Sequence, residues 1–131
     1  MEHLIRSYFL KKPEFIAVYL YGSQAADKQR IDSDVDIGIL LRQMDLKRGD
    51  ELRDQVILEL SRILKKDIHP VILNTAGEEL LRQIFSKGRC VLTNDSKLLA
   101  QFKIASLSRI AEFGYYRKII QKGFLRSLRE A

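Results

Sequence analysis

The sequence predicts an α/β (α+β) fold, in which a small mixed β-sheet is flanked by helices and followed by a long C-terminal helix. A continuous apolar and β-prone run at 15–21 is typical of a strand buried on both faces. Apolar residues recur at helical spacing over 49–64 and again from 97 to near the end. Because the 131 residues contain no linker-like stretch, we expect a single domain over 1–131, with its core at about 1–95.

The elements can be taken in chain order. Leu4, Ile5, Tyr8 and Phe9 predict a first helix over 2–11, which Pro13 ends. The remaining predicted elements are the strand at 15–21, a short helical turn within 23–29, a strand at 35–41, a helix at 49–64, a strand at 67–73, a turn at 74–77, a helix at 78–86 and a strand at 90–92.

Proline and glycine positions add detail to the predicted strands and helices. Pro70 indicates that the third strand lies at a sheet edge or contains a bulge. Gly88 is expected to end the preceding helix in the manner of a C′ glycine. Gly114 and Gly123 are expected weak points in the C-terminal helix.

Composition argues against membrane and secreted classes. No run approaches the roughly 20 apolar residues of a membrane helix, and the start at 1–4 does not resemble a signal peptide. Cys90 is the only cysteine, so it forms no internal disulfide, and we interpret it as a small apolar strand residue. We expect a cytoplasmic protein that does not enter a membrane.

The positive charge is concentrated in the C-terminal helical segment at about 97–131. This segment holds eight Lys or Arg and two Glu, so it accounts for the chain's whole net charge of +6. It faces an acidic partner, a nucleic acid or water. No recognisable RNA-binding motif accompanies it, so we do not expect nucleic acid as a direct substrate.

Two short motifs carry candidate chemistry. Gly22 and Ser23 follow a buried strand and precede a predicted helical turn, where backbone amides and the serine hydroxyl can approach a phosphate closely. Taken alone, this pair is more typical of a tight turn than of a phosphate site. Asp34 and Asp36 occupy alternate positions at the start of the next strand, so both carboxylates project from one face and suit Mg²⁺. Taken alone, the acidic pair also fits an exposed strand end.

The combination of the two motifs is more specific than either part. Gly22-Ser23, ten intervening residues and Asp34-Val35-Asp36, after an apolar strand, resemble the signature of the polymerase-beta-type nucleotidyltransferase superfamily. Within it, the flanks at 19–25 and 33–37 resemble the minimal nucleotidyltransferases (MNT). A looser similarity over 71–92 extends the resemblance across most of the first 95 residues.

The resemblance implies a mechanism. It assigns the triphosphate of ATP to Gly22 and Ser23, and two Mg²⁺ ions to Asp34 and Asp36. Such a division suits phosphoryl transfer, which depends on positioning and on neutralising the charge of the transferring group. The resemblance also implies a third metal-ligating carboxylate on a neighbouring strand. Asp67 is the candidate for it, whereas alignment on Leu73-Asn74 puts His69 at that place, as an alternative ligand or base.

Minimal nucleotidyltransferases are commonly paired with a small helical HEPN toxin. The resemblance therefore implies an antitoxin that transfers AMP to a tyrosine of that toxin. Two alternatives stay open, namely a non-catalytic antitoxin that acts by binding and an adenylyltransferase of a small molecule. The apolar C-terminal helix either covers the domain's own core or binds a partner or a second copy.

Overall fold

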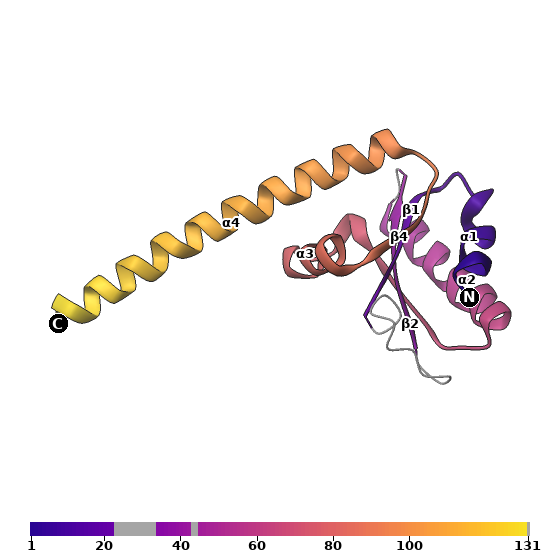
Figure 1. The fold of residues 1–131 in the computed structure, drawn as a ribbon, viewed down its shortest axis with the longest axis horizontal. Coiled ribbons are helices and arrows are strands. Elements are labelled where there is room, and N and C mark those ends of the chain that lie inside the picture. The colour runs from indigo at the N-terminus through magenta and orange to yellow at the C-terminus, as the bar shows by residue number, and fades with distance from the viewer. Residues whose placement is uncertain (23–33, 43–44, 131) are drawn as a thin grey trace.

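Four strands form one mixed β-sheet, as the sequence predicts (Figure 1). The computed structural model describes residues 1–22, 34–42 and 45–130. In spatial order the sheet is β3-β2-β1-β4; β1 is antiparallel to β2 and β4, and β2 is parallel to β3. The strand bounds are Phe15–Tyr21 for β1, Val35–Leu41 for β2, Ile68–Ile72 for β3 and Arg89–Thr93 for β4.

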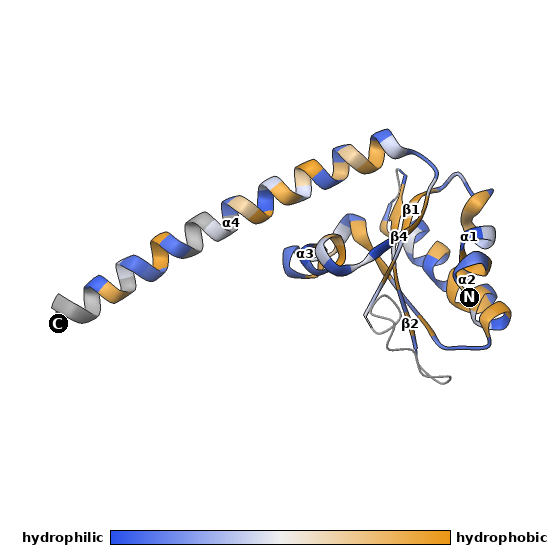
Figure 2. Ribbon diagram, in the orientation of Figure 1, coloured by the Kyte–Doolittle hydropathy of each residue, from blue (hydrophilic) through white to orange (hydrophobic). Residues whose placement is uncertain are grey.

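Helices cover both faces of this sheet. Figure 1 shows α1 (Glu2–Leu10) and α2 (Leu46–Leu64) on one side, and α3 (Glu78–Lys87) with the start of α4 (Ser96–Glu130) on the other. A short 3-10 helix, η1 (Leu73–Thr75), leads from β3 toward α3. Figure 2 shows apolar residues concentrated where these layers meet. Among the described residues, no helix combines the length and apolar character needed to span a membrane.

The central strand explains why two separate apolar clusters form. In β1, the first six residues are all buried, which confirms the predicted strand with two covered faces. Val18 and Leu20 pack with α1 and α2 in the first cluster, whereas Tyr19 packs with α3 and α4 in the second. Alternation along the strand sends successive side chains to opposite faces, so β1 contributes to both clusters.

The start of α2 and the conformation of the glycine after α3 differ from the expectation. The second helix begins at Leu46, before the predicted residue 49, because the Asp45 carboxylate caps it by accepting a 2.7 Å hydrogen bond from the Arg48 backbone N–H. α3 ends at Gly88, as predicted, but Gly88 does not adopt the left-handed conformation usual for a C′ glycine, since its φ is −77°. Glycine is required there for space: an added Cβ would collide with the carbonyl oxygen of Ile84.

Pro70 lies in an edge strand, as predicted. β3 is the outermost strand on its side of the sheet and pairs only with β2 among the described strands. The bulge offered as the alternative is absent, because the parallel pairing runs in unbroken register from Val35 beside Ile68 to Ile39 beside Ile72. The third strand also starts one residue later than predicted, so Asp67 immediately precedes it.

The C-terminal helix is a single element. α4 has 35 residues and continues without interruption through Gly114 and Gly123, which the sequence analysis treats as weak points. Its first turns cover the domain's own core through Leu99, Phe102 and Ile110. Figure 1 shows its second half projecting away from the sheet, with the C-terminus remote from every other element.

Candidate functional site

Asp34 and Asp36 flank a fully buried residue at the start of β2. Val35 is 0% exposed and belongs to the core, whereas Asp34 is exposed and Asp36 is half-buried. This alternation places the two carboxylates on the face opposite Val35. On the same face farther along the strand, Gly38 meets Leu73 and Ile84, which belong to the cluster under α3 and α4. The acidic pair therefore lies at the open end of that face, beyond the apolar cover.

The turn after β1 brings backbone against one of these carboxylates. Gly22 has a φ of +71°, a left-handed conformation that favours glycine. A Cβ added at Gly22 would lie 2.8 Å from Oδ2 of Asp36, so the missing side chain is what allows this approach. Ser23, the other predicted phosphate-binding residue, lies outside the described residues.

The edge strand supplies a histidine rather than a third carboxylate. In the parallel pairing of β2 and β3, His69 is the partner of Asp36. Its Nε2 atom lies 3.1 Å from Oδ2 of Asp34, and both side chains are more than half exposed. Asp67 sits one step before the strand, where its carbonyl oxygen accepts a 2.9 Å hydrogen bond from the Val35 N–H. Sequence alignment on Leu73-Asn74 already pointed to position 69.

The more buried acid of the pair, Asp36, has a raised pKa. Burial is the main cause of the raised pKa of the Asp36 carboxyl; the His69 charge opposes the shift and the Asp34 charge adds to it. Tyr21, the β1 partner of Asp36, also has a raised pKa, chiefly because of burial and then because of the Asp36 charge. In the sequence, Tyr21 is the last residue of the predicted strand at 15–21 and part of the flank at 19–25, with no role of its own. Cross-strand pairing with the acidic motif is the signal that would have singled it out.

The donor set fits Mg²⁺ that is shared with phosphate. Among residues 1–22, 34–42 and 45–130, no three His, Cys, Asp or Glu side chains form a metal-binding group by themselves. Magnesium in proteins is commonly held by one or two carboxylates while substrate phosphates and water complete its octahedron. Asp34 and Asp36 meet this requirement, since their two carboxylates lie on the same face at the start of β2.

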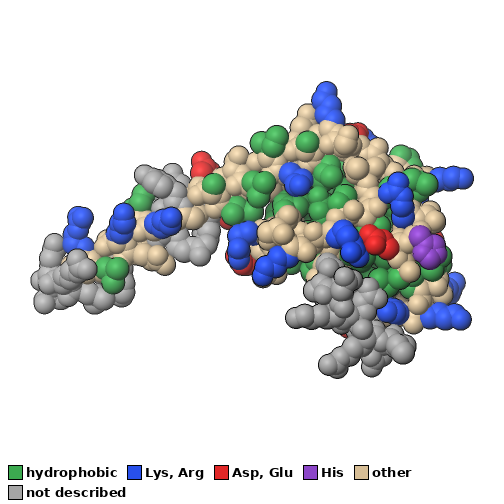
Figure 3. All heavy atoms as spheres, in the orientation of Figure 1, with side chains coloured by type: hydrophobic (Ala, Val, Ile, Leu, Met, Phe, Trp, Pro, Cys, Tyr) green, Lys and Arg blue, Asp and Glu red, His purple; other side chains and the backbone are tan. Residues whose placement is uncertain are grey.

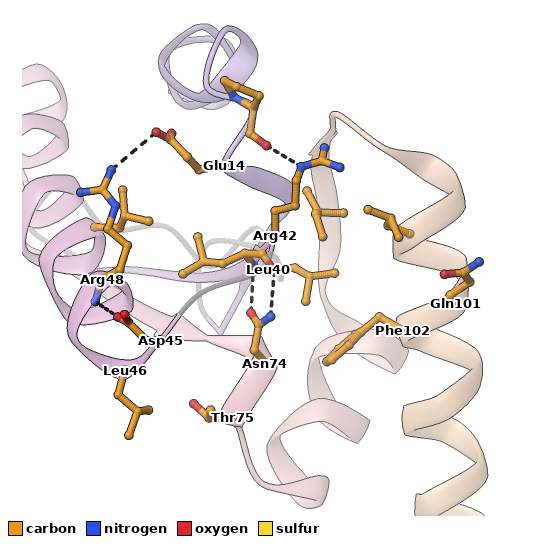
Figure 4. A pocket seen from close by; sticks show the side chains of 15 residues that line it. Glu14, Leu40, Arg42, Asp45, Leu46, Arg48, Asn74, Thr75, Gln101 and Phe102 are labelled. Atoms are coloured by element: carbon orange, nitrogen blue, oxygen red, sulfur yellow. Dashed lines mark hydrogen bonds and ion pairs between the residues drawn. The ribbon is translucent and has the colours of Figure 1, made fainter.

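A separate groove lies at the other end of β2. It has a volume of about 1150 Å³ and runs between the start of α2, η1 and the start of α4. Figure 4 shows Asn74 in the wall of this groove. Its side-chain amide accepts a 2.9 Å hydrogen bond from the backbone N–H of Leu41 and donates one of 2.8 Å to the carbonyl oxygen of Leu41. Leu41 is five residues beyond Asp36, about 16 Å along an extended strand, so this groove is distinct from the acidic site.

The fold and the acidic site agree with one family model. The model for polymerase beta, nucleotidyltransferase matches residues 3–97, which includes all four strands and the acidic pair. The chain belongs to this nucleotidyltransferase family. None of the curated proteins matches the chain.

Solved structures extend the similarity over the C-terminal helix. A chain in a crystal structure of a toxin–antitoxin with AMP-PNP is 22% identical, with a TM-score of 0.73, and the match covers 95% of this chain and 98% of that one. A chain in the complex of tri-AMPylated HEPN toxin with MNT antitoxin from Shewanella oneidensis is 21% identical, with a TM-score of 0.66 and coverage of 95% and 99%. At such identities the similarity shows a shared fold.

Proposed function

We propose that the protein is an Mg²⁺-dependent adenylyltransferase, which transfers AMP from ATP to a tyrosine hydroxyl of a HEPN-family toxin and thereby acts as its antitoxin. The observation that carries the proposal is the pair Asp34 and Asp36 on one sheet face, with the Gly22 backbone pressed against Asp36. Family membership supports nucleotidyl transfer, and the similar structures described with AMP-PNP and with an AMPylated toxin support the donor and the acceptor.

Each residue has a distinct task in this proposal. Gly22, followed by Ser23, gives the triphosphate access to backbone donors at the end of β1. Asp34 and Asp36 would hold two Mg²⁺ ions, which supply charge neutralisation at the phosphates and at the attacking oxygen. The Nε2 atom of His69 lies 3.1 Å from the Asp34 carboxylate, which supports a role in orienting Asp34, and the other ring nitrogen, Nδ1, would accept the proton of an incoming hydroxyl. Asp67 is the second candidate for the third position.

A second candidate function is an antitoxin that catalyses no reaction. The resemblance implies a third carboxylate where this chain has His69, and the contact between His69 and Asp34 engages one of the two acids. This observation favours an antitoxin that neutralises its partner by binding alone. Transfer of AMP to a small molecule is the remaining candidate, and it would require no protein acceptor.

Labelled ATP distinguishes the candidates. Purified protein is incubated with Mg²⁺, α-labelled ATP and the HEPN-type product of the neighbouring gene, and the toxin is examined by mass spectrometry for added AMP. We expect transfer by the wild-type chain and none by the double variant Asp34→Asn with Asp36→Asn. The matched control is Asp50→Asn with Asp54→Asn, which changes two exposed acids on α2 and should leave transfer intact. Toxin neutralisation by the Asp34/Asp36 variant at wild-type strength would refute the enzymatic role.

The third position has its own test. If His69 stands in for a carboxylate, His69→Asp should retain or increase transfer, whereas His69→Ala should reduce it. Asp67→Asn is the comparison for the neighbouring acid. A loss of transfer with Asp67→Asn and none with His69→Ala would assign the third position to Asp67.

A further inference from the structure

The second half of α4 leaves the domain. An α-helix rises about 1.5 Å per residue, so the 35 residues of α4 extend roughly 50 Å. Among the side chains of α4 that the structure describes, Ile110 is the last one packed against the core cluster formed with α3. No described side chain beyond Ile110 belongs to either core cluster. Figure 1 shows this projecting half, residues 111–130, standing clear of the other elements.

Apolar side chains are exposed along the projecting half. Ile119, Ile120 and Leu125 are 48%, 70% and 53% exposed, which is high for residues of this size in a folded domain. Lys118, Lys122 and Arg126 recur every four residues, so they form one basic stripe on the helix. Figure 3 shows Lys and Arg side chains along this part of the molecule.

Helical geometry places the exposed apolar side chains and the basic stripe on different sides of α4. Ile120 lies on the opposite side from the basic stripe, and Ile119 and Leu125 border that stripe on its two sides, because successive residues turn by about 100°. Ile120 lies five helical turns after Phe102, so it continues outward the face that packs on the domain. The apolar arc is therefore broader than the seam of a two-helix contact. It matches a helix laid in a groove between two helices.

The positive charge of α4 indicates which kind of partner it binds. Residues 97–131 carry eight basic and two acidic side chains, and the rest of the chain is electrically balanced. A second copy that docked through the same helix would bring the same excess of positive charge to the contact, and like charges repel. An acidic rim on a different protein would complement the stripe of Lys118, Lys122 and Arg126.

We propose that residues 111–130 of α4 dock into an apolar, acid-rimmed groove between two helices of a partner protein. This proposal rests on the proposed function, in which that partner is the helical HEPN-type acceptor. Recognition of the acceptor then lies on α4, separate from the acidic site that carries the chemistry.

The test compares matched variants in binding the neighbouring HEPN-type protein. Ile120→Asp with Leu125→Asp should weaken the complex about 100-fold or more, because buried apolar contacts dominate such interfaces. Lys118→Glu with Lys122→Glu should weaken it about tenfold and reduce its salt dependence. Leu46→Asp with Leu58→Asp makes the same chemical change at exposed α2 leucines and should bind as wild type does. Calorimetry measures both partner binding and Mg²⁺–ATP binding, and the latter should be unchanged in every variant.

The outcomes separate this proposal from the activity. Wild-type binding without AMP transfer, lost in the α4 variants, would uphold the docking surface and remove the proposed activity. Equal binding by the α4 variants and by wild type would overturn the docking surface, whether or not AMP is transferred. A wild-type dimer that the α4 changes convert to monomer, or α4-dependent binding to phosphatidylglycerol vesicles without partner binding, would also overturn it.

Discussion

Replacing Gly22 with alanine tests the site where backbone and carboxylate meet. Gly22 has a φ of +71°, and the left-handed conformation costs an L-residue with a side chain roughly 1–2 kcal/mol. The added Cβ would also lie 2.8 Å from Asp36 Oδ2, well inside the usual contact distance of about 3.5 Å, so the carboxylate must move. The expected loss of stability lowers the melting temperature by about 3–10 °C for a domain of this size.

The displaced carboxylate should weaken function more than it weakens folding. A misplacement of about 1 Å in a reacting group can cost roughly 100-fold in rate, so we expect a loss of transfer of that order. Circular dichroism follows unfolding, and transfer of labelled AMP follows activity below the lowered melting temperature. Gly77→Ala is the matched control: nothing lies within 4 Å of its added Cβ, and its φ of −67° is one that any residue adopts. A Gly22→Ala protein that melts and reacts as wild type does would refute the reasoning.

Three further changes probe the charge, the hydrogen bonds and the core. The raised pKa of Asp36 means that the folded protein binds this proton more tightly than the unfolded chain does, so without Mg²⁺ stability falls as pH rises above the usual aspartate pKa. Asp36→Asn should remove that decline in melting experiments with EDTA, and an unchanged pH profile would contradict the assigned burial. Asn94 shares its side-chain amide among the carbonyls of Phe9, Lys12 and Phe15 at 3.2, 3.2 and 2.9 Å. Asn94→Ala should cost about 1–3 kcal/mol in urea unfolding, and a cost near zero would show that water replaces the amide. Leu60 is 0% exposed, so Leu60→Ala should cost about 2–5 kcal/mol, whereas Leu58→Ala on the exposed side of the same helix should change stability by less than about 0.5 kcal/mol.

Periodic patterns were sufficient for most of the secondary structure. The apolar run of β1 and the helical stripe of α2 depend on local alternation, which the chain displays directly. Helix and strand ends were less accurate, because caps and close contacts decide them. Asp45 extends α2 at its start, and the contact with Ile84 explains Gly88 without a left-handed turn.

The candidate site was predicted in part. Alternation alone put Asp34 and Asp36 on one face, since both belong to the same strand. The choice between Asp67 and His69 depends on how β3 aligns with β2, which is a contact between segments about 30 residues apart. That register pairs His69 with Asp36 and brings its Nε2 to Asp34, and no local pattern encodes such a pairing.

The chain's own residues thus determine the strands, the helices, the acidic motif and the concentration of positive charge at the C-terminal end, because each is a local property of side-chain order. Tertiary structure decides three other features: the close approach of Gly22 to Asp36, the contact of His69 with Asp34, and the residue at which α4 leaves the core. The last could not be read from periodicity, since the same apolar spacing runs through both halves of the helix. Only the extent of the sheet and of α3 limits how much of that face the domain can cover.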